Sequence, residues 1–215
     1  MNEINLLKSL PQNKKNVSAR ESAKTDEHIK ISREYGEMYF DGPREYGYGG
    51  YRYDGRWQPV AKDIIKYYNL KSGSKVLDVG CAKGFLVKDL VNEGIDAYGL
   101  DISDYAIRNC ESEVIGRLQV GTADNLPFPD NSFDVVISIT TLHNLDREDF
   151  IVAIKEIERI SKVGIFITLD AYRNEEERLA MEAWNLTALT VMQVDEWKTF
   201  FKEIGYTGDY YWFMP

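Results

Sequence analysis

The chain has 215 residues, 44% of them hydrophobic and 28% charged, with a formal net charge of −9. This size suits a single domain, and the composition excludes wholesale disorder. The acidic balance disfavours a nucleic-acid partner, because binding to a phosphate backbone depends on clustered Lys and Arg. Two cysteines, Cys81 and Cys110, lack metal-ligand spacing, so we expect neither a metal site nor a disulfide framework.

The amino-acid sequence shows no recognisable targeting or membrane signal. No apolar run approaches the roughly 18 residues that a membrane span needs, and the polar N-terminus does not resemble a signal peptide. We therefore expect a cytoplasmic protein with no membrane partner.

The first sixty residues divide into two segments. Residues 1–30 are polar, rich in lysine and without sustained periodicity, which predicts a flexible arm or a frayed helix. Residues 31–60 include the stretch YGEMYFDGPREYGYGGYRYDGRW at 35–57, which combines repeated Gly with tyrosines, a tryptophan and three arginines. The glycines disfavour a long helix or a regular strand. A loop so rich in aromatic side chains is expected to cover something, and we predict a lid.

Residues 61–215 form the predicted domain. Runs rich in Val, Ile and Leu alternate with amphipathic stretches, which indicates a mostly parallel sheet with helices on both faces, a Rossmann-like α/β fold. The predicted strands are 75–80, 96–101, 117–121, 133–139, 163–169 and 206–213. The predicted helices are 84–93, 103–112, 147–161, 175–187 and 195–204. In the third of these helices Asp146 is the expected N-cap, and the expected buried stripe is Phe150, Ile151, Ile154, Ile157 and Ile160.

The first predicted strand ends in a glycine turn, DVGCAKG at 78–84, and a helix follows at once. Such a turn lets backbone approach a ligand and presents helix N–H groups to it. A dinucleotide fingerprint would require glycines where Ala82 and Phe85 stand, and a phosphate-binding P-loop would require Ser or Thr after Lys83. Both patterns fail, which disfavours an NAD-dependent oxidoreductase. Asp101 ends the second predicted strand, where a carboxylate can accept both hydroxyls of a ribose; Ser103 suits the following N-cap better.

Three segments in this order and spacing, VLDVGCAKG, GLDIS and GTADNLPFPDNSFDVVIS, resemble the class I S-adenosylmethionine-dependent methyltransferases of the methyltransferase-11 type. The resemblance covers about residues 60–170 and implies S-adenosyl-L-methionine as cofactor, with S-adenosyl-L-homocysteine as product. It places the glycine turn on the methionine part, Asp101 on the ribose, Ile102 on the adenine face, and Ala123 with Asp124 on the adenine edge. Ala82 departs from the third glycine that is common in this family. The predicted cofactor-binding residues are Asp78, Gly80, Cys81, Gly84, Asp101, Ile102, Ala123, Asp124, Thr140 and Arg56.

The chemistry is expected at the carboxyl ends of the later strands. His143 follows the fourth predicted strand and is the candidate general base, since histidine titrates near neutral pH. Cys81 is expected to be structural, because methyl transfer from a sulfonium needs no covalent intermediate. The predicted substrate-binding residues are Arg52, Tyr51, Tyr53, Asp170 and Tyr172.

The arginines of the predicted lid suggest an acceptor that is a small, polar and anionic molecule, methylated on O or N. Parts of the sequence, including YGYGGYRYDGRW and the segment 184–188, resemble family members of surface-polysaccharide and nucleotide-sugar pathways. We therefore expect a nucleotide-linked sugar or a small acid. A catalytically silent cofactor-binding partner subunit remains an alternative, because fold does not determine function.

Overall fold

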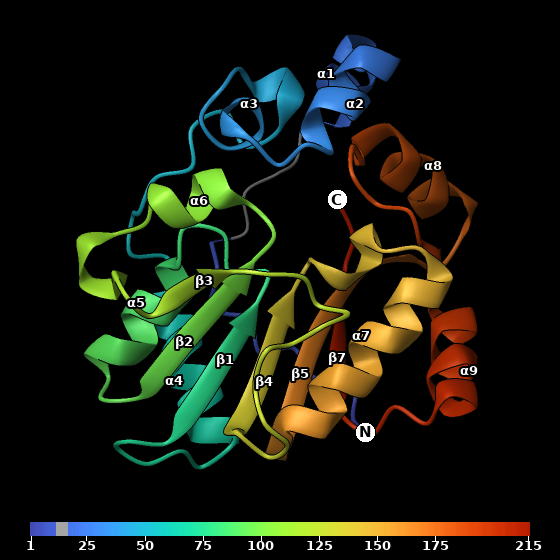
Figure 1. The fold of residues 1–215 in the computed structure, drawn as a ribbon. Coiled ribbons are helices and arrows are strands. Elements are labelled where there is room, and N and C mark those ends of the chain that lie inside the picture. Colours follow the sequence, from blue (N-terminus) through green and yellow to red (C-terminus); the bar gives the residue numbers. More distant parts are fainter. Residues whose placement is uncertain (12–16) are drawn as a thin grey trace.

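A seven-stranded sheet forms the centre of the computed structural model, which describes residues 1–11 and 17–215. Its order is β3-β2-β1-β4-β5-β6, with β7 also paired to β5, and the pairings between these strands are parallel. This confirms the predicted α/β fold (Figure 1). The strands are β1 Lys75–Val79, β2 Asp96–Asp101, β3 Leu118–Val120, β4 Phe133–Ile139, β5 Ser161–Tyr172, β6 Met192–Gln193 and β7 Asp209–Phe213.

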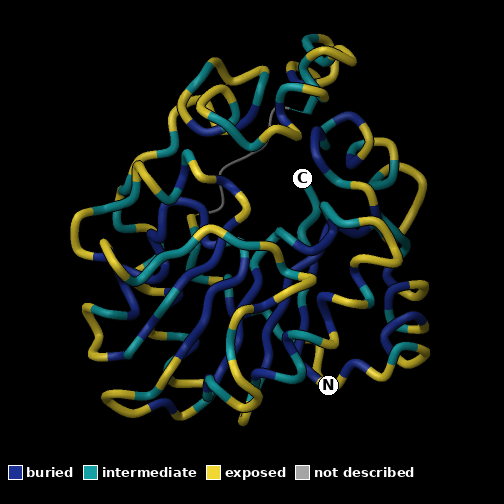
Figure 2. The backbone as a smooth tube through the Cα atoms, viewed as in Figure 1, coloured by how far each residue is buried: buried dark blue, intermediate teal, exposed yellow. Residues whose placement is uncertain are grey.

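Helices cover both faces of the sheet. The side chains of β1 alternate, so that Val76 packs in the core beneath α4 and α5, whereas Leu77 packs in the core beneath α7 and α9. Figure 2 shows the strands as the most continuously buried part of the chain. The domain helices are α4 Gln58–Tyr67, α5 Phe85–Asn92, α6 Asp104–Arg108, α7 Arg147–Ile160, α8 Glu175–Trp184 and α9 Val194–Ile204.

Helix α7 follows its sequence pattern closely. The Asp146 carboxylate accepts hydrogen bonds from the backbone N–H groups of Glu148 and Asp149, each at 3.0 Å, which confirms the predicted N-cap. Four of the five predicted stripe residues are buried, while Ile151 is only partly buried at the edge of the stripe. Local capping and periodicity therefore define this helix.

Other boundaries differ from the predictions. The predicted helix 103–112 is shorter, because α6 ends at Arg108 and the separate 3₁₀ turn Ser112–Val114 follows. The last strand begins at Asp209 instead of residue 206, since the chain first leaves α9 through Gly205 in the left-handed conformation. Helix α4 begins at Gln58, inside the segment assigned to the lid, and Pro59 stands in its first turn, where proline is favoured.

Residues near the N-terminus pair with the last strand of the sheet. The Ile4 N–H donates to the carbonyl of Tyr210 at 2.9 Å, so residues beside Glu3 extend the sheet at β7. Residues 12–16 of the predicted arm lie outside the described residues. Four short elements follow: α1 Val17–Ala23, α2 Asp26–Ser32, α3 Glu37–Phe40 and the 3₁₀ turn η1 Arg44–Tyr46. Figure 1 shows α1, α2 and α3 beyond the carboxyl ends of the strands, on the same side as α6 and α8.

Within residues 1–11 and 17–215, no helix has the length and apolarity needed to cross a membrane. The same described residues contain no cluster of three or more His, Cys, Asp or Glu suited to hold a metal ion.

Candidate active site

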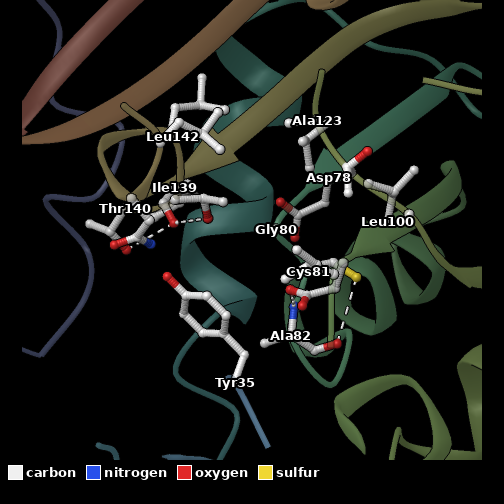
Figure 3. Close-up of a pocket in the computed structure, with 18 of the residues that line it drawn as sticks. Tyr35, Asp78, Gly80, Cys81, Ala82, Leu100, Ala123, Ile139, Thr140 and Leu142 are labelled. Carbon is white, nitrogen blue, oxygen red and sulfur yellow. Dashed lines mark hydrogen bonds between the residues drawn. The ribbon is translucent and has the colours of Figure 1, made fainter. Parts of the chain in front are cut away.

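A cavity of about 330 Å³ lies at the carboxyl ends of β1, β2 and β4. The strand order reverses between β1 and β4, and ligands of open α/β sheets bind in the crevice at such a point. Its volume is in the range of small-molecule sites. Figure 3 shows Asp78, Leu100 and Ala123 on one side of the cavity and Tyr35 pointing in from the opposite side.

The turn after β1 forms the floor of the cavity. Gly80 has a φ of +84°, and a Cβ at this position would lie 2.6 Å from the Thr141 Cβ, so only glycine fits without displacing its neighbour. Ala82 also lies in the left-handed region, with a φ of +50°. An L-residue in this region costs about 1–2 kcal/mol, so the glycine common at this position in the family would be less strained. The turn thus stores backbone strain beside the cavity, as functional sites often do.

Asp101 at the end of β2 holds that strained turn in place. Its Oδ2 accepts the N–H of Ala82 at 2.7 Å, and its Oδ1 accepts the N–H of Ser103 at 2.8 Å. Each carboxylate oxygen can accept a further hydrogen bond, so the group remains able to receive two hydroxyls from the cavity. Ser103 caps α6 by accepting the Ala106 N–H at 3.0 Å, which confirms its predicted role.

The cavity is acidic. The carboxylates among its lining residues belong to Asp78, Asp101, Asp124 and Asp149, and no Lys, Arg or His is found among the described lining residues. Burial, together with the nearby charge of Asp101, raises the pKa of Asp78 to about 7. Such a site favours a cationic ligand and disfavours the pyrophosphate of a dinucleotide. S-adenosylmethionine carries a sulfonium and an ammonium group, so its charge fits these residues.

We expect the affinity for S-adenosylmethionine to rise with pH up to about 7. A bound cation favours ionised Asp78, so below its pKa of about 7 binding must first displace the proton, which costs up to tenfold in affinity per pH unit. Calorimetry between pH 5.5 and 7 should show this slope in the wild type and a much flatter profile in Asp78→Asn. An equal slope in both proteins would contradict this role for Asp78.

The region expected to receive adenine is formed by three predicted residues. Ile102 lines the cavity with 58% of its surface exposed, and Ala123 and Asp124 line the same cavity. An exposed Ile beside a hollow is a suitable apolar platform for a planar ring. Thr140 lines the cavity from the end of β4 and has a φ of +50°, an unusual conformation for a β-branched residue.

An aromatic wall, which we define as the cavity-lining side chains Tyr35, Tyr39, Phe40, Tyr48, Tyr51 and Trp57, closes the opposite side. The Tyr51 ring stacks on Phe85 at a centroid distance of 4.6 Å, and Tyr39 meets Tyr48 edge-on at 5.2 Å. Of these residues only Tyr51 was singled out by the sequence. The aromatic composition of 35–57 was the available signal, but it could not show which rings face inward.

Asp41 ties the aromatic wall to the glycine turn. The Lys83 Nζ lies 2.5 Å from Asp41 Oδ2, the Tyr105 hydroxyl donates to the same oxygen at 2.7 Å, and the Tyr51 N–H donates to Oδ1 at 3.1 Å. Burial opposes ionisation of Asp41, but the hydrogen bonds from Lys83 and Tyr105 outweigh it, so the pKa of Asp41 is lowered. This ion pair joins segments 42 residues apart in the sequence.

We expect Asp41→Asn to release bound S-adenosylmethionine roughly tenfold faster than the wild type. The substitution removes a charge-assisted hydrogen bond to a nearly buried ammonium, of a kind that contributes about 1.5–3 kcal/mol. Stopped-flow displacement would measure the rate. Asp54→Asn is the matched control, because Asp54 is an exposed carboxylate of the same segment and pairs with Arg56. Equal release rates of S-adenosylmethionine in both variants would argue against a role of the Asp41–Lys83 ion pair in retaining the cofactor.

Several predicted ligand residues lie away from the cavity. Arg52 is exposed and Arg56 forms an ion pair with Asp54, and neither lines the cavity. The Tyr53 hydroxyl donates to Asp89 at 2.5 Å on α5 and is likewise outside the lining. Gly84 does not line the cavity either; its φ of +75° turns the chain into α5. Arg56 is held by Asp54 and Tyr53 by Asp89, so their side chains are engaged away from the cavity.

His143 is buried and lies outside the cavity lining. Its Nδ1 accepts the backbone N–H of Asp170 at 3.1 Å, and burial lowers its pKa despite the nearby Asp170 carboxylate. This is the environment of a neutral structural histidine, and the structure does not bring it to the position of a general base. Asp170 is buried beside it and accepts a hydrogen bond from Asn185 at 2.5 Å, while Tyr172 lines a separate hollow between α2 and α8.

Comparison with known proteins agrees with this geometry. A family model described as "Methyltransferase domain" matches residues 77–168. Demethylmenaquinone methyltransferase of Geobacillus stearothermophilus is 35% identical over 112 residues, which are 48% of this chain and 47% of that protein. Sterol 24-C-methyltransferase of Aspergillus fumigatus is 31% identical over 215 residues, 86% of this chain and 56% of that protein. A tRNA (carboxymethyluridine(34)-5-O)-methyltransferase of Arabidopsis thaliana is 33% identical over 144 residues, 66% of this chain and 34% of that protein.

The chain spans about half the length of the first two of these relatives and a third of the last. Among solved structures, an S-adenosylmethionine-dependent methyltransferase of Methanosarcina mazei superposes with a TM-score of 0.53 at 23% identity, covering 66% of this chain and 82% of that one. One from Archaeoglobus fulgidus gives 0.52 at 21% identity, covering 69% and 68%. At these identities the likeness concerns the fold. Residues 77–168 therefore match a methyltransferase domain, and the fold is like that of the class I, S-adenosylmethionine-dependent methyltransferases.

Proposed function

We propose that this protein transfers a methyl group from S-adenosylmethionine to an O or N atom of a small, uncharged molecule that contains an apolar or aromatic ring. The observation that carries the proposal is the cavity itself, with an acidic cofactor side at β1, β2 and β4 and the aromatic wall opposite. When bound, S-adenosylmethionine supplies an electrophilic methyl group on a sulfonium. The contribution of the protein is then to align the acceptor and exclude water, and orientation alone can supply on the order of 7–11 kcal/mol of a barrier.

The lining favours a neutral ring over an anion. Tyrosine and tryptophan rings stack on planar or apolar molecules and offer hydroxyls for polar substituents. An anionic acceptor would instead meet Asp124 and Asp149 with no cation among the described lining residues. This argument replaces the expectation of an acceptor bound by Arg52 and Arg56. Relatives named for demethylmenaquinone and sterol methylation support the ring-bearing nature of the acceptor, although the name of the sterol relative specifies transfer to a carbon atom.

A carboxylate at the cavity would serve the proton chemistry. Because His143 does not line the cavity, the proton of a hydroxyl or amine acceptor would pass to a carboxylate that does. Asp149, in the first turn of α7, is exposed and lines the cavity. The nucleotide-linked sugar and the small acid expected from the sequence remain as competing acceptors in the test below.

The proposal is tested in two steps. First, mass spectrometry of the purified protein should find S-adenosylmethionine or S-adenosylhomocysteine, and calorimetry should show no comparable binding of NAD. Second, labelled cofactor is offered with quinols, phenols, sterols, nucleotide sugars, small acids and total tRNA. Label in the quinol, phenol or sterol fractions alone is the expected result. Label only in sugars, acids or tRNA would overturn the acceptor class, and cofactor binding without any turnover would support a silent partner subunit.

A further inference from the structure

Two arginines converge on a single carbonyl oxygen outside the cavity. Arg20 of α1 donates from Nη2 to the carbonyl of Gly47 at 3.1 Å, and Arg44 of η1 donates from Nη1 to the same oxygen. The guanidinium carbons lie 4.9 Å and 5.3 Å from the ring centroid of Trp184, at the end of α8. Three segments far apart in the sequence therefore meet around two like charges.

These charges lack an acidic counterpart. Arg20 is 8% exposed, and its Nη1 has no hydrogen-bond partner among residues 1–11 and 17–215. In the same described residues no carboxylate lies within the 4 Å of an ion pair from either guanidinium, although Glu45 acts on Arg20 from farther away. A buried cation without a counterion is costly. The face of Trp184 and one shared carbonyl compensate only part of that cost.

We propose that Arg20 and Arg44 form a binding site for a phosphate or carboxylate group. Guanidinium groups bind such oxyanions through paired N–H donors, and two of them supply both the charge and the donors that a small oxyanion requires. The unpartnered Nη1 of Arg20 is buried and Arg44 is exposed, so a ligand would approach from the side of Arg44. In a chain of net charge −9, these two adjacent cations are distinctive because none of the described carboxylates forms an ion pair with them.

An oxyanion bound by these arginines would also stabilise the packing of the aromatic wall. A Cβ on Gly47 would lie 2.7 Å from the Tyr39 ring, so the carbonyl shared by the arginines belongs to backbone packed directly against that tyrosine. The next residue, Tyr48, lines the cavity. An anion bound by Arg20 and Arg44 would neutralise their mutual repulsion and hold α1, η1 and α8 together. Its source is either a free anion or an acidic group on a ring-bearing molecule other than the uncharged methyl acceptor.

Inorganic phosphate is the probe, titrated by calorimetry against protein in chloride buffer of matched ionic strength. We expect saturable binding by the wild type and at least tenfold weaker binding by Arg44→Gln, because one charged donor pair is lost. Arg108→Gln is the control, since it removes an equal charge from an exposed arginine that pairs with Asp104. Phosphate should change the tryptophan fluorescence of the wild type but not of Trp184→Phe.

The source of the anion is distinguished with benzoate and its methyl ester. Benzoate that competes with phosphate, and an ester that does not, would indicate a site for an acidic ring-bearing molecule; phosphate binding unaffected by benzoate would indicate a free anion. Wild-type protein that binds phosphate no better than chloride would overturn the proposal, as would an equal loss in Arg108→Gln and Arg44→Gln. Because binding is measured without turnover, these outcomes are independent of the proposed methyl transfer.

Discussion

Asp101→Ala is expected to weaken the binding of S-adenosylmethionine and of S-adenosylhomocysteine by about 30-fold or more. Hydrogen bonds to a charged group contribute roughly 1.5–3 kcal/mol each, and the carboxylate is placed to receive two ribose hydroxyls. The same side chain holds the N–H of Ala82 at 2.7 Å, so its loss also frees the strained turn. Both effects lower affinity for either ligand, since they act on the nucleoside and not on the methyl group.

Calorimetry with both ligands measures this effect. Asp104→Ala is the matched control, because Asp104 is an exposed carboxylate nearby that pairs with Arg108 and lies outside the cavity lining. The control removes the same charge and should leave affinity within about twofold, as expected for a screened surface charge. A wild-type affinity in Asp101→Ala, or an equal loss in the control, would remove Asp101 from the cofactor site.

Gly80→Ala is expected to have the second large effect, because two penalties coincide at this position. Its φ of +84° is unfavourable for any L side chain, and the new Cβ would lie 2.6 Å from the Thr141 Cβ. Strain costs about 1–2 kcal/mol, while the clash must push Thr141 or the turn out of place. Since both line the cavity, we expect at least tenfold weaker cofactor binding together with a lower free energy of unfolding.

Gly116→Ala separates the two penalties. Gly116 has a similar φ of +82°, but a Cβ there would meet nothing within 4 Å. This control should show the strain alone, a loss of about 1–2 kcal/mol in the free energy of unfolding with unchanged cofactor affinity. Denaturant unfolding and calorimetry on both variants measure the comparison. Cofactor affinity reduced equally in the two would show that the close approach to Thr141 has no role.

The sheet and most of the helices could be predicted from the amino-acid sequence, as could several residues that line the cavity. Apolar periodicity and caps such as Asp146 act between residues close in the chain, so they could be recognised without a structure. The glycine turn and Asp101 were equally recognisable, because parallel strands bring their carboxyl ends to one edge. The roles of Ile102, Ala123 and Asp124 came from the resemblance to a known family, and these residues line the cavity together with Asp78 and Gly80.

Which side chains of the remaining segments face the cavity depends on contacts between distant parts of the chain. His143 lies in a 3₁₀ turn that directs its ring toward the Asp170 N–H, and no periodic pattern specifies that direction. In the segment 35–57, repeated glycines prevent a regular secondary structure with a repeating pattern of buried side chains. The sequence therefore cannot show that the tyrosines point inward and the arginines outward. Their orientation depends on contacts across long sequence separations, such as Asp41 with Lys83 and Arg20 with Trp184. Such contacts form only after the sheet has brought the segments together.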